Sequence, residues 1–253
     1  MVTDQPHLLT YLLRVADDNL VVAQRLGELI AGMPELEEDI AVANIALDHL
    51  GQARNVYTYA TDVDPAGRDE DQFAMLRPER EFLNAVLVEQ PNGDFAQTIV
   101  RQFFLDAYQV PLYTALASSA DDRMAGIAAK ASKEARYHLE HSSAWLITLG
   151  DGTDESHRRA QNAVDYLWQF TADLFAADEV EDELMSQAIA PDPIELRASF
   201  DVAVADVLRA ARLEQPTDPY QRLGGRTGLH TAHLGHLLPE LQWLYRAHPG
   251  ATW

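Results

Sequence analysis

The chain has 253 residues, and 47% of them are hydrophobic, which is enough for a sizeable core and too high for a disordered chain. Forty acidic residues against 19 basic ones give a formal net charge of −21. The negative electrostatic potential of such a chain repels phosphate backbones and anionic lipid, which argues against nucleic acid and membranes as partners. Because there is no cysteine, disulfides, thiolate metal sites and cysteine nucleophiles are excluded. The N-terminal residues show no basic segment followed by an apolar run, so we expect no signal peptide, no transmembrane helix and a cytoplasmic protein.

Alanine and leucine dominate, strand-like alternation is nearly absent, and glycine and proline gather between long segments, which predicts an all-α protein. In chain order the helices are expected at about 6–31, 35–61, 78–89 (shorter and apolar), 94–118, 121–149, 154–177, 193–213 and 229–247. Pro34 and the acidic turn that follows it suit the positive end of a helix dipole. Long helices with short or medium connections describe a helical bundle, and we expect one domain over residues 1–253.

Four long helices each place a polar residue on the stripe expected to face the core. These residues are Asn19, Asp48, Asp106 and His138. The stripe of the second helix is expected to consist of Ile40, Asn44, Leu47 or Asp48, Gly51, Asn55 and Tyr59. A polar side chain in the core is costly unless it is paired, so these positions are where chemistry is expected.

A carboxylate-bridged di-iron bundle takes one Glu from each of two helices and a Glu-x-x-His pair from each of the other two. The positions of that pattern in this chain are Asn19, Asp48, Gly51, Asp106, Ala135 and His138. Gly51 and Ala135 each remove one member of a pair, and Asn19 removes a charge. At most three of the six ligands remain, too few carboxylates and imidazoles for two iron ions. We therefore expect a degenerate di-iron remnant that holds no metal, binds no cofactor and contributes no catalytic residue.

Two other interpretations of these residues stay open. Asn19, Asp48 and His138 would form a structural, hydrogen-bonded polar network, which is the favoured one. Alternatively, Glu134 and His138, spaced i, i+4, would hold a single metal ion together with Asp48 or Asp106.

Weaker signals lie elsewhere. His138 and His141 are three residues apart, and His230, His233 and His236 follow one another at the same step, which would suit a surface metal trap but is more typical of an ordinary helix face. A basic cluster would accept a phosphate or an acidic partner, although ion pairs within the chain are the more ordinary use. Its members are Lys130, Lys133, Arg136, Arg158 and Arg159. The segment Gly224–Gly228 (GGRTG) lies outside any strand–helix context and is interpreted as a loop.

Five stretches carry a resemblance to a known family: Leu20–Leu29 (LVVAQRLGEL), Ala43–Asn55 (ANIALDHLGQARN), Leu87–Ala96 (LVEQPNGDFA), Lys133–Leu139 (KEARYHL) and Gly228–Gly235 (GLHTAHLG). Together, and over most of the chain, they are similar to the PaaC subunits of bacterial phenylacetyl-CoA monooxygenase, the ring-1,2-epoxidase. The resemblance implies a ferritin-like bundle with additional C-terminal helices. It also implies an assembly in which a related ferritin-like subunit holds the di-iron centre and binds the CoA thioester. The other members implied are a small bridging subunit and a reductase that supplies electrons.

In that family the subunit resembled here is structural, and it pairs with the catalytic subunit without a working metal site. We therefore expect a non-catalytic subunit that stabilises the di-iron subunit in phenylacetate catabolism, with outer apolar residues of the first two helices forming the pairing surface. Examples of such residues are Leu29, Ile30, Val42 and Ile45. The alternatives are a free-standing ferritin-like metal-binding protein or oxidoreductase with an atypical site, and a binding protein with no enzyme connection.

Overall fold

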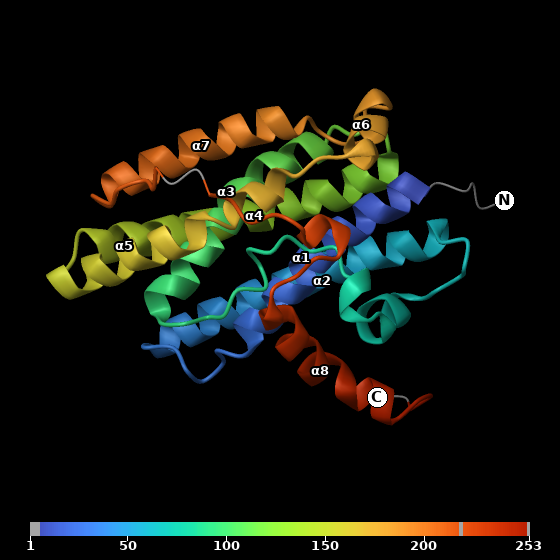
Figure 1. Cartoon of the computed structure of the whole chain (residues 1–253), viewed down its shortest axis with the longest axis horizontal. Coiled ribbons are helices and arrows are strands. Elements are labelled where there is room, and N and C mark those ends of the chain that lie inside the picture. The colour runs from blue at the N-terminus through green and yellow to red at the C-terminus, as the bar shows by residue number, and fades with distance from the viewer. Residues whose placement is uncertain (1–5, 218–219, 252–253) are drawn as a thin grey trace. The chain divides into compact units, whose positions relative to one another are not determined.

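The computed structural model describes residues 6–217 and 220–251, and within these ranges it is built of helices and irregular connections, without a strand (Figure 1). The α-helices are α1 (Pro6–Gly27), α2 (Leu36–Val63), α3 (Phe95–Leu116), α4 (Asp122–Gly150), α5 (Asp154–Trp168), α6 (Glu179–Ser186), α7 (Pro193–Ala210) and α8 (Ala232–Ala247). Short helical turns lie at Gln72–Leu76, Glu79–Glu81, Thr171–Phe175 and Gly225–Thr227. The predicted all-α fold class is confirmed, and the helical content agrees with a ferritin-like bundle.

The chain divides into two compact units, which are described separately. Unit 1 consists of the residues up to Gln90 together with those from Leu223 onward, and unit 2 consists of Pro91–Arg222. The single domain expected over residues 1–253 stays a prediction.

Unit 1 is built on α1 and α2, which lie side by side along most of their length (Figure 1). Nearly every residue of α1 between Leu8 and Leu26 is buried, so this helix forms the core of the unit. It ends at Gly27, four residues before the expected end, because the chain then forms tight turns that place Ala31 at a left-handed φ of 67°. α8 packs on the π-helical turn Gln72–Leu76, whose last carbonyls accept hydrogen bonds from Gln242 and Arg246.

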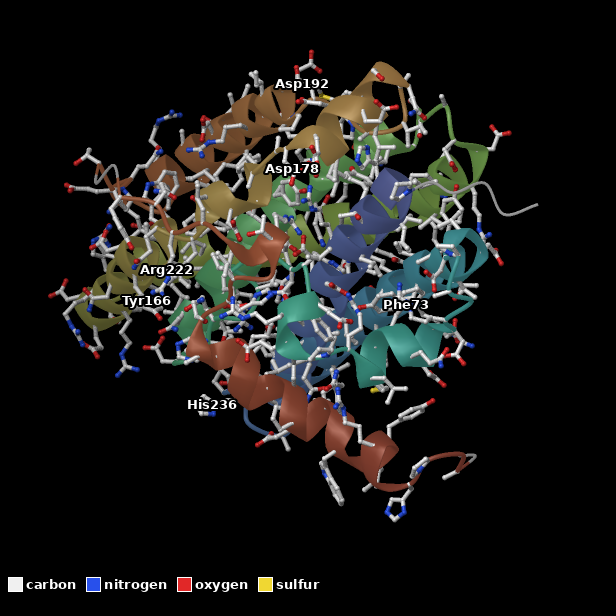
Figure 2. The ribbon with its side chains drawn as sticks, turned by 45° about the vertical axis from the view of Figure 1, so that its right-hand side comes forward. Phe73, Tyr166, Asp178, Asp192, Arg222 and His236 are labelled. Atoms are coloured by element: carbon white, nitrogen blue, oxygen red, sulfur yellow. The ribbon has the colours of Figure 1, made fainter. Side chains whose placement is uncertain are left out.

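Unit 2 is built on the long pair α3 and α4, with α5 and α7 packed against α3. An aromatic cluster joins these elements, and it consists of Phe104, Trp168, Phe175 and Phe200. Each helix of the unit begins at a side-chain cap, as favoured N-cap residues predict. The caps are Asp94, Asp121, Thr153, Asp178 and Asp192. Figure 2 shows two of them, Asp178 and Asp192, at the starts of α6 and α7.

The prediction of a helix near 78–89 is wrong. Only Glu79–Glu81 is helical, as a single 3-10 turn, and residues 82–90 form an irregular segment that is almost entirely buried. Its backbone N–H groups find partners outside a helix: those of Leu83 and Ala85 donate to the carboxylates of Asp17 and Asp18 on α1, each at 2.7 Å. The apolar run therefore reflects burial rather than helix formation.

Two further boundaries differ from the prediction. The helix expected over 154–177 ends at Trp168 and is followed by a 3-10 turn, and α6 was not predicted at all. α6 has only eight residues, too short for a periodic apolar pattern to stand out, although Asp178 and Glu181 form the capping box that marks its start.

Candidate functional site

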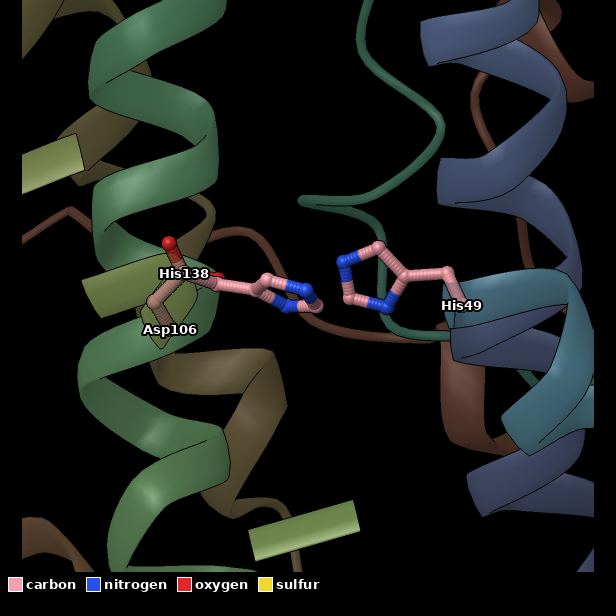
Figure 3. A group of neighbouring side chains, drawn as sticks. All are labelled: His49, Asp106 and His138. Carbon is pink, nitrogen blue, oxygen red and sulfur yellow. The ribbon is translucent and has the colours of Figure 1, made fainter. Parts of the chain in front are cut away.

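Asn19 and His49 form a buried polar contact between α1 and α2. Both side chains are buried, and the Nδ1 of His49 lies 2.8 Å from the Oδ1 of Asn19. The amide of Asn19 donates to the carbonyl of Val15 at 2.8 Å, so its oxygen faces the imidazole and Nδ1 is the protonated nitrogen. Asn19 is thus buried and hydrogen-bonded, but its partner is His49 rather than Asp48. Figure 3 shows His49 on its helix.

The prediction of which α2 residues face inward is wrong, because the buried face is displaced by about one residue from the predicted one. Asp48 and Gly51 are half-buried, whereas Ile40 and Leu47 are 55% and 63% exposed. The buried residues are Val42, Ile45, Ala46, His49, Gln52, Ala53, Val56, Tyr57, Tyr59 and Ala60. α2 carries two apolar stripes, and periodicity alone does not say which one faces the core. Of the predicted stripe, Tyr59 is buried.

Asp106 on α3 is fully buried in unit 2 and accepts two hydrogen bonds, from the Oγ of Ser142 and the Nε2 of Gln102, each at 2.7 Å. Burial raises the pKa of this carboxyl to about 8, although both hydrogen bonds oppose the shift. Asp106 is therefore mostly a neutral acid at pH 7.

Ala135 and His138 lie on the buried face of α4, as predicted, together with Ser142. Figure 3 draws His138 and Asp106, which belong to α4 and α3. Glu134, the carboxylate of the single-metal alternative, is half-buried and lies 3.5 Å from the ammonium of Lys130. Ala135 offers no ligand atom, so α4 keeps the imidazole and lacks the carboxylate of a Glu-x-x-His pair.

The consecutive aspartates of α1 form a site that the sequence reasoning missed. Asp17 accepts hydrogen bonds from Arg77, the Tyr57 hydroxyl and the Leu83 N–H, and all of its side chain is buried. Two adjacent acidic residues within an apolar helix were the available signal, since a buried carboxylate needs a cation or several donors.

Asp18 binds the guanidinium of Arg226 through both oxygens, at 3.0 and 2.8 Å, and accepts from the Ala85 N–H. Burial raises the pKa of Asp18, while Arg226 and the backbone donor partly offset this effect. Arg226 belongs to the Gly224–Gly228 loop, so the loop is anchored to α1. Gly228 adopts φ 77°, and a Cβ there would lie 2.3 Å from the carbonyl oxygen of Arg80, which explains why this position holds glycine.

His230 lies before α8 rather than on it, so the three predicted histidines do not share a helix face. Its Nδ1 lies 2.8 Å from Oε2 of Glu89 and its Nε2 lies 2.8 Å from the carbonyl of Phe82. Burial lowers the pKa of His230, but the carboxylate of Glu89 and the carbonyl of Phe82, one at each ring nitrogen, raise it above the usual value overall. His236, in contrast, is exposed on α8 (Figure 2).

Ion pairs within the chain involve several members of the predicted basic cluster. Arg158 and Arg159 both bind Glu155, at 2.7 Å, and Lys130 faces Glu134. No helix in the described part of the chain is both long and apolar enough to cross a membrane.

Together the helices define an all-α protein of the ferritin-like class, with buried polar residues on its long helices. A family model described as "Phenylacetic acid catabolic protein" matches residues 2–253, and the chain belongs to that family. It is 51% identical over 246 residues to an Escherichia coli (strain K12) protein, named as the C subunit of 1,2-phenylacetyl-CoA epoxidase, covering 97% of this chain and 99% of that relative.

Proposed function

We propose that this chain is the structural subunit of a phenylacetyl-CoA 1,2-epoxidase of the cytoplasm, where it pairs with the di-iron catalytic subunit and stabilises it. The observation that carries the proposal is the 51% identity to a named member of such an epoxidase over almost the full length of both chains. Besides the catalytic subunit, the small bridging subunit and the reductase are the expected further members of the assembly.

The donor chemistry supports a non-catalytic role. Within unit 2, Ala135 supplies no carboxylate. Within unit 1, Asn19 is neutral and binds His49, and Gly51 has no side chain. Two iron ions need several anionic oxygen ligands, and these positions do not supply them. The residues present therefore do not fit a di-iron centre.

Iron content tests this part of the proposal. We expect the full chain, purified from iron-replete cells in the absence of the other subunits, to contain far less than one iron or manganese per molecule by elemental analysis. A stoichiometric metal that is lost in an Asp106→Asn variant would instead support a free-standing ferritin-like oxidoreductase.

A stripe of exposed apolar residues on α2 supports the pairing. Leu36, Ile40, Leu47 and Leu50 are 70%, 55%, 63% and 46% exposed, and with Ala43 they follow one another at alternating steps of four and three residues. That spacing is the seam along which one helix packs on another. A stripe of this kind exposed to water marks an interaction site.

The pairing surface therefore differs from the one expected. Val42 and Ile45 are 3% and 1% exposed and belong to the core of unit 1, so their assignment to the surface was wrong. Ile30 is 59% exposed, as an outer residue should be. The exposed leucines of α2 take the place of the two buried residues.

Leu47→Asp should weaken binding to the catalytic subunit at least tenfold, because a carboxylate would be buried in an apolar contact. The dissociation constant is measured on purified subunits, with the fold checked by circular dichroism. Leu223→Asp, at a residue of similar exposure (58%) outside the stripe, should bind like the unaltered chain. If Leu47→Asp and the unaltered chain bind with equal affinity, α2 is not part of the interface. If the unaltered chain binds no other subunit, the proposed function itself is contradicted.

A further inference from the structure

A groove on unit 2 lies between the C-terminal half of α3 and the N-terminal half of α7, with Leu139 of α4 contributing to its wall. Its volume is about 440 Å³, and Val110, Pro111 and Leu196 supply much of its apolar lining. A volume of this size is typical of pockets that take up a ligand or several side chains, roughly 300–1,000 Å³. The exposed stripe on α2 that we propose as the pairing surface contains none of the residues that line this groove.

The groove exists because of the residue pattern of α7. Leu196, Phe200, Val204 and Leu208 recur every four residues and form the buried face of the helix. The adjacent row contains Ser199 and Ala203, whose short side chains leave space beside α3. α7 runs along α3 here, as Figure 1 shows.

The apolar surface continues beyond the groove. Ile194 and Val202 are 78% and 64% exposed and lie on the outer side of α7 with the exposed Ala198 between them. The groove and this outer row extend over residues 191–203, of which 193–203 are helical and span about 15 Å at 1.5 Å per residue. That length matches about three turns of a second helix packed alongside.

One acidic side chain lines the same groove. Glu195 is exposed and is the one charged residue among the lining residues, and within the described part of the chain it has no ion pair. A basic side chain on a partner packed into the apolar groove would find this carboxylate beside it.

We infer that this groove binds an amphipathic helix of another subunit, with apolar side chains in the groove and a lysine or arginine against Glu195. The inference rests on the proposed function, since it takes the partner to be a member of the epoxidase assembly. A basic partner is favoured over a second copy because this chain carries a net charge of −21, which would oppose self-association.

Two substitutions in the full chain test the inference against the purified other subunits. Ala203→Trp fills the groove, and Glu195→Lys reverses its charge. Each should weaken the affinity for one of the subunits at least tenfold, and the effect of Glu195→Lys should shrink at high salt. The matched controls on the same helix, Ala210→Trp and Asp206→Lys, should bind within twofold of the unaltered chain. Residues 193–204 should exchange amide hydrogens more slowly in the complex than in the isolated chain.

Other outcomes would overturn the inference. One such outcome is that the groove variants bind like the unaltered chain and that amide exchange over 193–204 does not change in a complex that Leu47→Asp disrupts. That outcome would exclude this groove as an interface and leave the proposed function intact. An isolated chain that dimerises and is made monomeric by Ala203→Trp would assign the groove to a second copy. An unaltered chain that binds none of the subunits would defeat both proposals. If Ala203→Trp fails to fold, Glu195→Lys decides, because Glu195 is exposed.

Discussion

Arg77→Met should lower the free energy of unfolding by about 3–5 kcal/mol, which is the usual cost of removing one partner from a buried ion pair. Arg77 is 3% exposed and Asp17 is fully buried, so the substitution would leave a carboxylate in the core without its cation. Methionine keeps much of the apolar stem and isolates the loss of the guanidinium. Urea unfolding at pH 7 is the measurement.

The loss would spread beyond the pair itself. Arg77 also donates to the carbonyls of Phe73 and Glu81, at 2.7 and 2.8 Å. These bonds tie Arg77 to the two helical turns that flank it, Gln72–Leu76 and Glu79–Glu81, just before the buried 82–90 segment. Asp17 in turn holds the Leu83 N–H, so a disordered carboxylate would release that segment from α1. Faster amide exchange over residues 77–90 is therefore expected in Arg77→Met.

Arg54→Met is the matched control, since Arg54 pairs with Glu70 at 3.1 Å but its side chain is 74% exposed. Exposed pairs contribute about 0–1 kcal/mol, so the same chemical change should cost little there. A comparable loss in both variants would mean that burial of the Asp17–Arg77 pair is not what makes it important.

The two interpretations of α2 show what sequence periodicity can and cannot decide. The helix itself is predicted almost to the residue, because its acidic first turn and its long apolar pattern are local features. Its orientation is not, because Leu47 and Ala46 belong to different apolar stripes and both fit helical spacing. A chain that carries one stripe for its core and one for a partner does not mark which is which.

Long-range pairing explains the other errors. The 82–90 segment is apolar, but its backbone bonds to side chains that are distant in sequence, among them the carboxylates of Asp17 and Asp18, which lie more than sixty residues away. His230 likewise pairs with Glu89 across 141 positions. Within unit 2 the inward positions of Ala135 and His138 on α4 are confirmed, since they follow from helical spacing alone.

Asp106→Asn should leave stability nearly unchanged near pH 4 and raise it by about 4 kcal/mol at pH 7. Burial raises the pKa of Asp106 to about 8 in the folded protein, against about 3.9 in an unfolded chain. Between these values the folded state binds more protons than the unfolded state. Stability is therefore lost as the pH rises, by up to about 1.4 kcal/mol per pH unit. Asparagine does not titrate, so this loss should disappear.

Asparagine also fits the hydrogen bonds that a neutral Asp106 makes. Its oxygen accepts from the Nε2 of Gln102, and its amide group takes the place of the acid O–H, because the Ser142 hydroxyl can rotate to become an acceptor. Asp48→Asn, the same change at a half-buried position of α2, is the control and should change stability by no more than about 0.5 kcal/mol.

The comparison of urea unfolding between pH 4 and 8 also bears on the function. Parallel pH profiles for Asp106→Asn and the unaltered chain would mean that the pKa of Asp106 is not raised and that its carboxyl is ionised in the folded protein at pH 7. An ionised carboxylate at this depth needs a cation beside it, and a bound metal would then be the first candidate. A profile that falls with pH only in the unaltered chain would show instead that Asp106 is a neutral acid at pH 7 in the isolated, metal-free subunit, as its burial without a cation predicts.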